Sequence, residues 1–190
     1  MLAILFISLI TVYSFASTVN VTKSTIQTKF GSLIYCYFER SAGSSGTTPS
    51  TNTAQTPLGS SGSYSLTRGS TLYIWSPQFT SATTINSGKW VLNLYAATTS
   101  GSGPITVSII ITNSAGTVKT TIVNSVSTPS LTTTKSLVLM SWSIAAASVP
   151  VNGYIGVKLT APSGSGNPSF TIYYGLNQQT DFQVPYRVLT

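Results

Sequence analysis

The chain has 190 residues, enough for one domain of ordinary size with an additional segment. Only 6% of its residues are charged, against about 25% in typical soluble proteins; nine Lys and Arg stand against two acidic residues, and His is absent. This composition excludes an ordinary cytoplasmic surface, and the spread of the basic residues along the chain without a cluster argues against nucleic-acid binding.

The first 16 residues, MLAILFISLITVYSFA, carry no charge and form an almost continuous apolar run. Such a segment is a secretory signal, a membrane anchor, or an apolar helix that packs against copies of itself. Ser14 and Ala16 precede Ser17 as small residues precede a signal-peptidase site, but the basic region expected before the apolar core is missing. All three alternatives predict that the rest of the chain lies outside the cell.

Apolar residues then recur at helical spacing as far as Phe38, so one interpretation is a single helix over residues 1–40. The β-branched run Thr18–Thr22 and Gly31 oppose a helix by local propensity, which packing against neighbouring helices can override. The predicted assembly interface on this helix comprises Leu2, Ile4, Leu5, Phe6, Ile7, Leu9, Ile10, Val12, Tyr13, Phe15, Val19, Ile26, Phe30 and Ile34.

The alternative division treats residues 1–16 as a removed signal and leaves an extended segment, Ser17–Phe38. Alternation at Val19 and Val21 and the apolar run from Leu33 to Phe38 suit a donor strand that inserts into the sheet of a neighbouring copy. The same segment contains the N-glycosylation sequon that begins at Asn20, which is usable where the region is exposed.

Residues 41–62 form a second region, rich in Ser, Thr and Gly, with no charge and one bulky aliphatic residue, Leu58. A segment of this composition buries too little apolar surface to offset the entropy lost when it is ordered. We therefore predict an exposed linker, whose hydroxyl groups suit O-glycosylation.

Residues 63–190 show a period of two, which is typical of strands with one buried face. The strand predicted over Ile105–Ile111 is followed by Asn-Ser-Ala-Gly at 113–116, which indicates a hairpin. Eight or so short strands predict a mainly β fold, an antiparallel β-sandwich of immunoglobulin-like or jelly-roll type preceded by the apolar helix. The other strands are expected at Leu72–Trp75, Lys89–Ala96, Val118–Ile122, Leu137–Ile144, Tyr154–Leu159, Phe170–Tyr174 and Phe182–Val188.

The chain has few groups for catalysis. Glu39 and Asp181 are the only acidic residues, and acid–base catalysis needs two titratable groups in one pocket. Without His, a serine nucleophile would need a Lys base, and the ligand sets of zinc, iron and copper are missing. We therefore expect no catalytic residues, cofactor, metal or enzymatic activity, and a stability that is nearly flat between acid and neutral pH.

The aromatic residues support a second hypothesis, a secreted carbohydrate-binding or adhesive module. Trp90 and Trp142 lie in alternating strand patterns and are expected in the core. Tyr173, Tyr174 and Tyr186 are expected on an exposed face, where they could contact either a sugar or another subunit.

The order of parts, an uncharged apolar helix and then a β-rich head, resembles the archaeal type IV pilin and archaellin group. In that group the mature subunit begins directly with its apolar helix, because a basic leader has been removed. The resemblance implies a structural subunit of an extracellular, pilus-like filament: a glycoprotein homopolymer at the cell surface. Its partners would be copies of itself and cell-surface glycans, with the membrane only before assembly and no nucleic acid.

Overall fold

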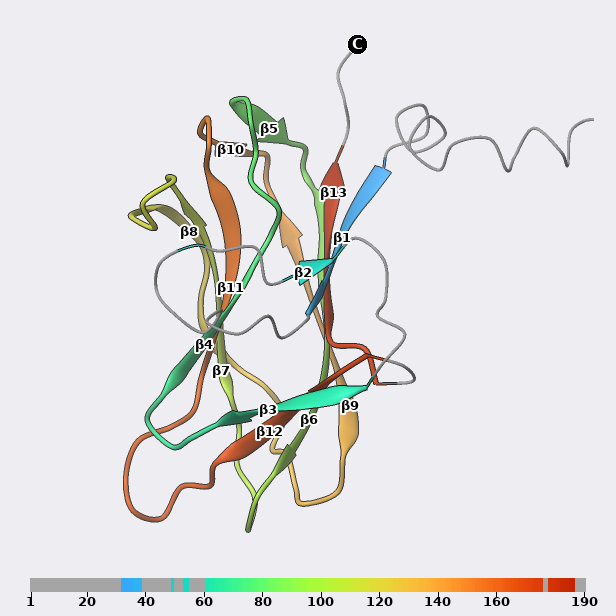
Figure 1. Ribbon diagram of the computed structural model, residues 1–190, viewed down its shortest axis with the longest axis vertical. Coiled ribbons are helices and arrows are strands. Elements are labelled where there is room, and N and C mark those ends of the chain that lie inside the picture. The colour runs from blue at the N-terminus through green and yellow to red at the C-terminus, as the bar shows by residue number, and fades with distance from the viewer. Residues whose placement is uncertain (1–31, 39–48, 50–52, 55–60, 176–177, 187–190) are drawn as a thin grey trace, which may run out of the picture. The chain divides into compact units, whose positions relative to one another are not determined.

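The computed structural model describes residues 32–38, 49, 53–54, 61–175 and 178–186, and every regular element in these ranges is a β-strand (Figure 1). No helix in this part of the chain is long and apolar enough to span a membrane. The strands are β1 (Ser32–Phe38), β2 (Thr53–Ala54), β3 (Gly62–Leu66), β4 (Thr71–Trp75), β5 (Thr83–Ile85), β6 (Gly88–Thr98), β7 (Thr106–Thr112), β8 (Val118–Ser127), β9 (Ser136–Ile144), β10 (Ala147–Val149), β11 (Tyr154–Thr160), β12 (Phe170–Tyr174) and β13 (Asp181–Tyr186).

The strands pair in antiparallel fashion, which confirms the mainly β, antiparallel prediction. A seven-stranded sheet has the order β2-β1-β13-β6-β12-β3, with β9 also paired to β6. A four-stranded sheet has the order β4-β11-β7-β8, and β10 pairs with β5. The chain divides into two compact units, of which Ile34–Pro185 carries the core and the sites described below.

The N-terminal predictions meet the structure only at β1. Residues 32–38, which the helix interpretation placed at the end of the helix, form a strand instead, because their aromatic and β-branched side chains favour extended backbone. The predicted assembly residue Ile34 lies in this strand. The other predicted assembly residues, from Leu2 to Phe30, and the sequon at Asn20 lie outside the described residues.

The alternation predicted for residues 89–96 is present in β6. Trp90, Leu92 and Leu94 are completely buried, whereas Asn93 and Tyr95 on the opposite face are half-buried. Each fully buried side chain of this size contributes roughly 1.5–3 kcal/mol to stability. β6 therefore has one face in the core and one face free to carry polar groups.

The hairpin predicted around residues 113–116 is confirmed. β7 pairs with β8, with Thr112 opposite Val118. The turn places Gly116 at φ 82°, in the left-handed region that glycine adopts without steric cost. The Asn113 side chain also accepts hydrogen bonds from the backbone N–H groups of Ala115 and Thr117, at 3.1 and 2.9 Å.

Candidate functional site

The candidate site lies where two strands share one edge of β6. Along this edge, β13 pairs with residues 91–93 and β12 pairs with residues 96–98, so the ladder is interrupted between them. Thr180 bridges the interruption: its hydroxyl accepts a hydrogen bond from the Tyr95 N–H at 3.1 Å and donates to the Tyr173 carbonyl at 2.7 Å. This bridge fixes the start of β13, and with it the position of Asp181.

Asp181 is held by two amide side chains on the outer face of the sheet. The Asn93 amide nitrogen donates to both carboxylate oxygens at 3.0 Å, and Asn93 is its direct partner in the ladder. The Gln183 amide donates to Oδ1 at 2.9 Å. Only 7% of Asp181 is exposed. Among the described residues, the hydrogen-bond donors to this carboxylate are thus neutral amides, with no cation among them.

Burial raises the pKa of the Asp181 carboxyl above its ordinary value, and the hydrogen bonds from Asn93 and Gln183 offset part of that rise. A carboxylate removed from water without a positive partner remains poorly stabilised. Such a group favours a ligand that brings a positive charge or a strong hydrogen-bond donor.

A pocket of about 340 Å³ opens beside this carboxylate. It is lined by Asn93, Tyr95, Leu137, Gln179 and Asp181. Leu137 is 41% exposed and faces Tyr95 across the β6–β9 ladder. The pocket therefore combines one charged group and two amides with an apolar wall, as small-molecule sites commonly do.

The sequence identified only part of this site. Asp181 was recognised as one of two acidic residues, whereas Glu39 lies outside the described residues. From the sequence, Asn93 and Gln183 were not assigned to a site. Asn93 does give one signal, because it is a polar residue between the apolar residues Leu92 and Leu94. Within the described ranges, no group of three His, Cys, Asp or Glu side chains could hold a metal ion.

No protein-family model matches the chain, and no curated protein sequence matches it. Comparison with solved structures finds the same fold within hydrolases. A CocE/NonD family hydrolase from Staphylococcus aureus matches 82% of this chain with a TM-score of 0.60 and 11% identity. An α-amino acid ester hydrolase also matches 82%, with a TM-score of 0.54 and 13% identity.

At these identities the likeness shows the fold alone. In both comparisons the match covers 36% of the hydrolase chain, so this chain spans about a third of the length of the structures it resembles.

These neighbours correct the predicted function. The prediction of a pilin-like archaeal filament subunit is wrong, because the structures that share the fold are hydrolases rather than filament proteins. That prediction gave the apolar N-terminal segment decisive weight, whereas the fold is defined by the residues that follow it. The names of these neighbours give no support to the adhesive alternative either.

The exclusion of enzymes is contradicted by the same neighbours, since their fold is one that hydrolases use. The expectation of no enzymatic activity rested on the small number of acidic residues and the absence of His, and it took no account of the environment of each carboxyl group. In the structure, one carboxyl lies in a pocket with a raised pKa, which is the environment typical of functional carboxyls.

Proposed function

We propose that this chain is a β-domain of a hydrolase-type protein and that it holds part of the substrate in the Asp181 pocket. The observation that carries the proposal is the buried carboxylate with neutral donors, placed at the wall of a pocket in a fold that hydrolases share. The residues of this chain cannot form a serine–histidine catalytic pair, because the chain has no His. Asp181 is therefore assigned to binding.

The finer fold is part of the same proposal. The seven-stranded and four-stranded sheets pack face to face as a β-sandwich, with the strand faces that carry Trp90 and Ile109 directed inward. Complete burial of both side chains, one from each sheet, supports this arrangement.

The substrate class follows from the charge of the pocket. A protonated amine is the group that best compensates an ionised, buried carboxylate. The neighbour named α-amino acid ester hydrolase is named for esters that carry such an amine. In this chain, the ammonium group would pair with Asp181, and an apolar side chain of the ester would lie against Tyr95 and Leu137.

Calorimetric titration of the full chain with L-phenylalanine methyl ester tests this function. The matched control ligand is methyl 3-phenylpropanoate, which has the same shape without the amine. We expect the amine-bearing ester to bind about tenfold more tightly, because one charge-assisted contact is worth roughly 1.5–3 kcal/mol. Replacing Asp181→Asn removes the preference while retaining an acceptor for Asn93.

The same samples are assayed for release of methanol. A binding domain leaves the rate of ester hydrolysis at its uncatalysed level. Equal affinity for the two ligands, or a preference that survives in Asp181→Asn, would contradict the proposed function. Rapid hydrolysis that Asp181→Asn abolishes would contradict the assignment of Asp181 to binding alone.

A further inference from the structure

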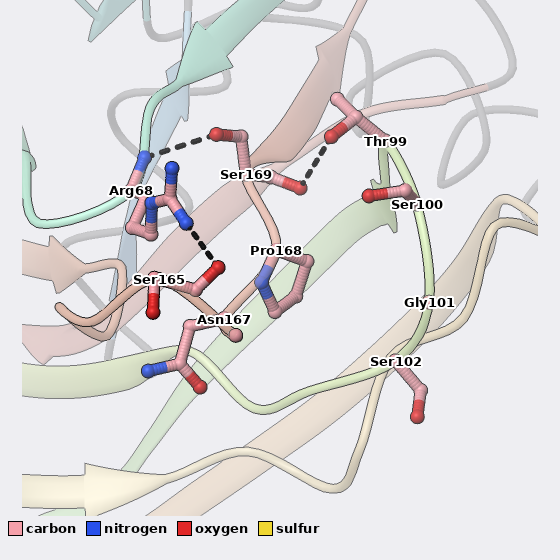
Figure 2. Close-up of a pocket in the computed structure, with 10 residues that line it drawn as sticks. Arg68, Thr99, Ser100, Gly101, Ser102, Ser165, Asn167, Pro168 and Ser169 are labelled. Carbon is pink, nitrogen blue, oxygen red and sulfur yellow. Dashed lines mark hydrogen bonds between the residues drawn. The ribbon is translucent and has the colours of Figure 1, made fainter.

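We propose that a second pocket, formed by three loops that meet at Ser169, binds a tetrahedral oxyanion, phosphate or sulfate, through Arg68. This site is separate from the Asp181 pocket and goes beyond the proposed function. Its volume is about 260 Å³, and the side chains that matter to the argument are Arg68, Thr99, Ser100, Ser102, Ser165 and Ser169 (Figure 2).

The three loops come from distant parts of the chain. Arg68 lies in the turn between β3 and β4, residues 99–102 connect β6 to β7, and residues 163–169 connect β11 to β12. Loops at the end of a β-fold are common carriers of binding residues, because the strands beneath hold them in place. Figure 2 shows these segments around one hollow, with Ser169 between Arg68 and Thr99.

Ser169 joins the loops through both its side chain and its backbone. Its hydroxyl accepts the Arg68 N–H at 3.0 Å. Its carbonyl accepts the backbone N–H of Thr99 at 2.9 Å and the Thr99 hydroxyl at 3.2 Å. The pocket is therefore held in shape before a ligand arrives, which reduces the entropy lost on binding.

The Arg68 guanidinium is held in place by only some of its hydrogen-bond donors. Nη1 donates to the backbone carbonyls of Ser165 and Gly164, at 2.5 and 3.3 Å. No other guanidinium hydrogen bond is made within the described residues, and a guanidinium has five N–H groups. Nε and Nη2 thus remain for a ligand, in the fork geometry that suits phosphate and sulfate.

The rest of the lining has the right chemistry for an anion. Five residues of the wall carry hydroxyl groups. The Thr99 hydroxyl already donates to the Ser169 carbonyl, and the other four can each donate one hydrogen bond to a ligand. Asp181, the one acidic residue within the described ranges, is not part of this wall. The chain's formal net charge of +7 adds a general attraction for anions. A tetrahedral oxyanion can accept hydrogen bonds from more of these donors than a carboxylate can, because it has more oxygen atoms.

Chemical-shift titration of the full chain at low ionic strength tests the site, with the backbone amides of Arg68, Thr99 and Ser169 as reporters. The probes are inorganic phosphate, sulfate and acetate, and methyl phosphate distinguishes an esterified group from the free anion. We expect saturable shifts at these amides with phosphate and sulfate, weaker ones with acetate, and a loss of affinity as salt is added. Arg68→Gln lowers the phosphate affinity about tenfold.

Two further variants test whether phosphate binds in the Arg68 pocket rather than through the general positive charge of the chain. Lys119→Gln removes the same charge from an exposed position on β8 and is expected to change affinity less than twofold. Gly166→Phe leaves Arg68 in place and adds a bulky side chain to the wall of the pocket, at a position where a Cβ meets no atom within 4 Å. It is expected to abolish phosphate binding even if Arg68→Gln proves unstable.

Three outcomes overturn the proposal: no saturable response to phosphate or sulfate, equal losses in Lys119→Gln and Arg68→Gln, or undiminished binding in Gly166→Phe. None of these bears on the Asp181 pocket, whose ligand is a cation, so the two proposals fail independently.

Discussion

The Asp181 and Arg68 pockets differ in what holds their charged group. Asp181 lies in a strand, 7% exposed, and its carboxylate is held by amides from that strand and from the adjoining β6. Arg68 is exposed in a turn and is held by the backbone carbonyls of a neighbouring loop. A strand-borne group is coupled to the stability of the sheet, whereas a loop-borne group can change with little effect on the fold.

The largest expected difference concerns apolar substitutions of the two residues. Asp181→Leu removes the acceptor of Asn93 and Gln183 and should lower the free energy of unfolding by about 2 kcal/mol, because each of these half-buried donors carries a penalty when it is left unpaired. Arg68→Leu should cost less than about 1 kcal/mol, as exposed substitutions commonly do. Urea denaturation of the two variants measures both values; equal losses would show that the pockets do not differ in this way.

A smaller effect is expected at the point where the loops of the Arg68 pocket meet. Ser169→Ala removes the acceptor of the Arg68 N–H but keeps the carbonyl that accepts from Thr99. Loss of one hydrogen bond should lower stability by about 1 kcal/mol and weaken phosphate binding. Ser130→Ala, at an exposed position, is the matched control. If both variants unfold at the same urea concentration, Ser169 does not organise these loops.

The smallest effect concerns the pH dependence of stability. Because the folded-state pKa of Asp181 is raised above the ordinary value of 3.8, the folded chain binds this proton more tightly than the unfolded chain. The free energy of unfolding should therefore rise slightly as pH falls through the raised pKa and level off below 3.8. Asp181→Asn should lose this rise. A fall in wild-type stability over the same range would mean that the carboxylate is stabilised in the folded state.

Much of the β-fold was predictable, because the period of two and the turn residues are local signals. The hairpin at residues 113–116 and the strands around Trp90 and Phe170 follow from them directly. The strands β5 and β10 have only three residues each, too short to show a period. They form because they pair with each other, although they lie far apart in the chain. A local sequence pattern does not predict such a pairing.

The sites were harder to predict for the same reason. Asn93 and Asp181 are 88 positions apart, and Arg68 and Ser169 are 101 positions apart. Sequence reasoning could single out Asp181 because acidic residues are so few. It could not place amides around Asp181, or bring three loops together at Ser169, because those contacts depend on how the strands pair.

The decisive measurement of whether Asp181 holds the substrate amine is the affinity of the wild-type chain and of Asp181→Asn for L-phenylalanine methyl ester and its amine-free analogue at neutral pH. We expect the wild type to prefer the amine-bearing ester by about tenfold and the variant to bind both ligands equally and weakly. The same preference in both proteins, or no preference in the wild type, would contradict a role for Asp181 in holding the substrate.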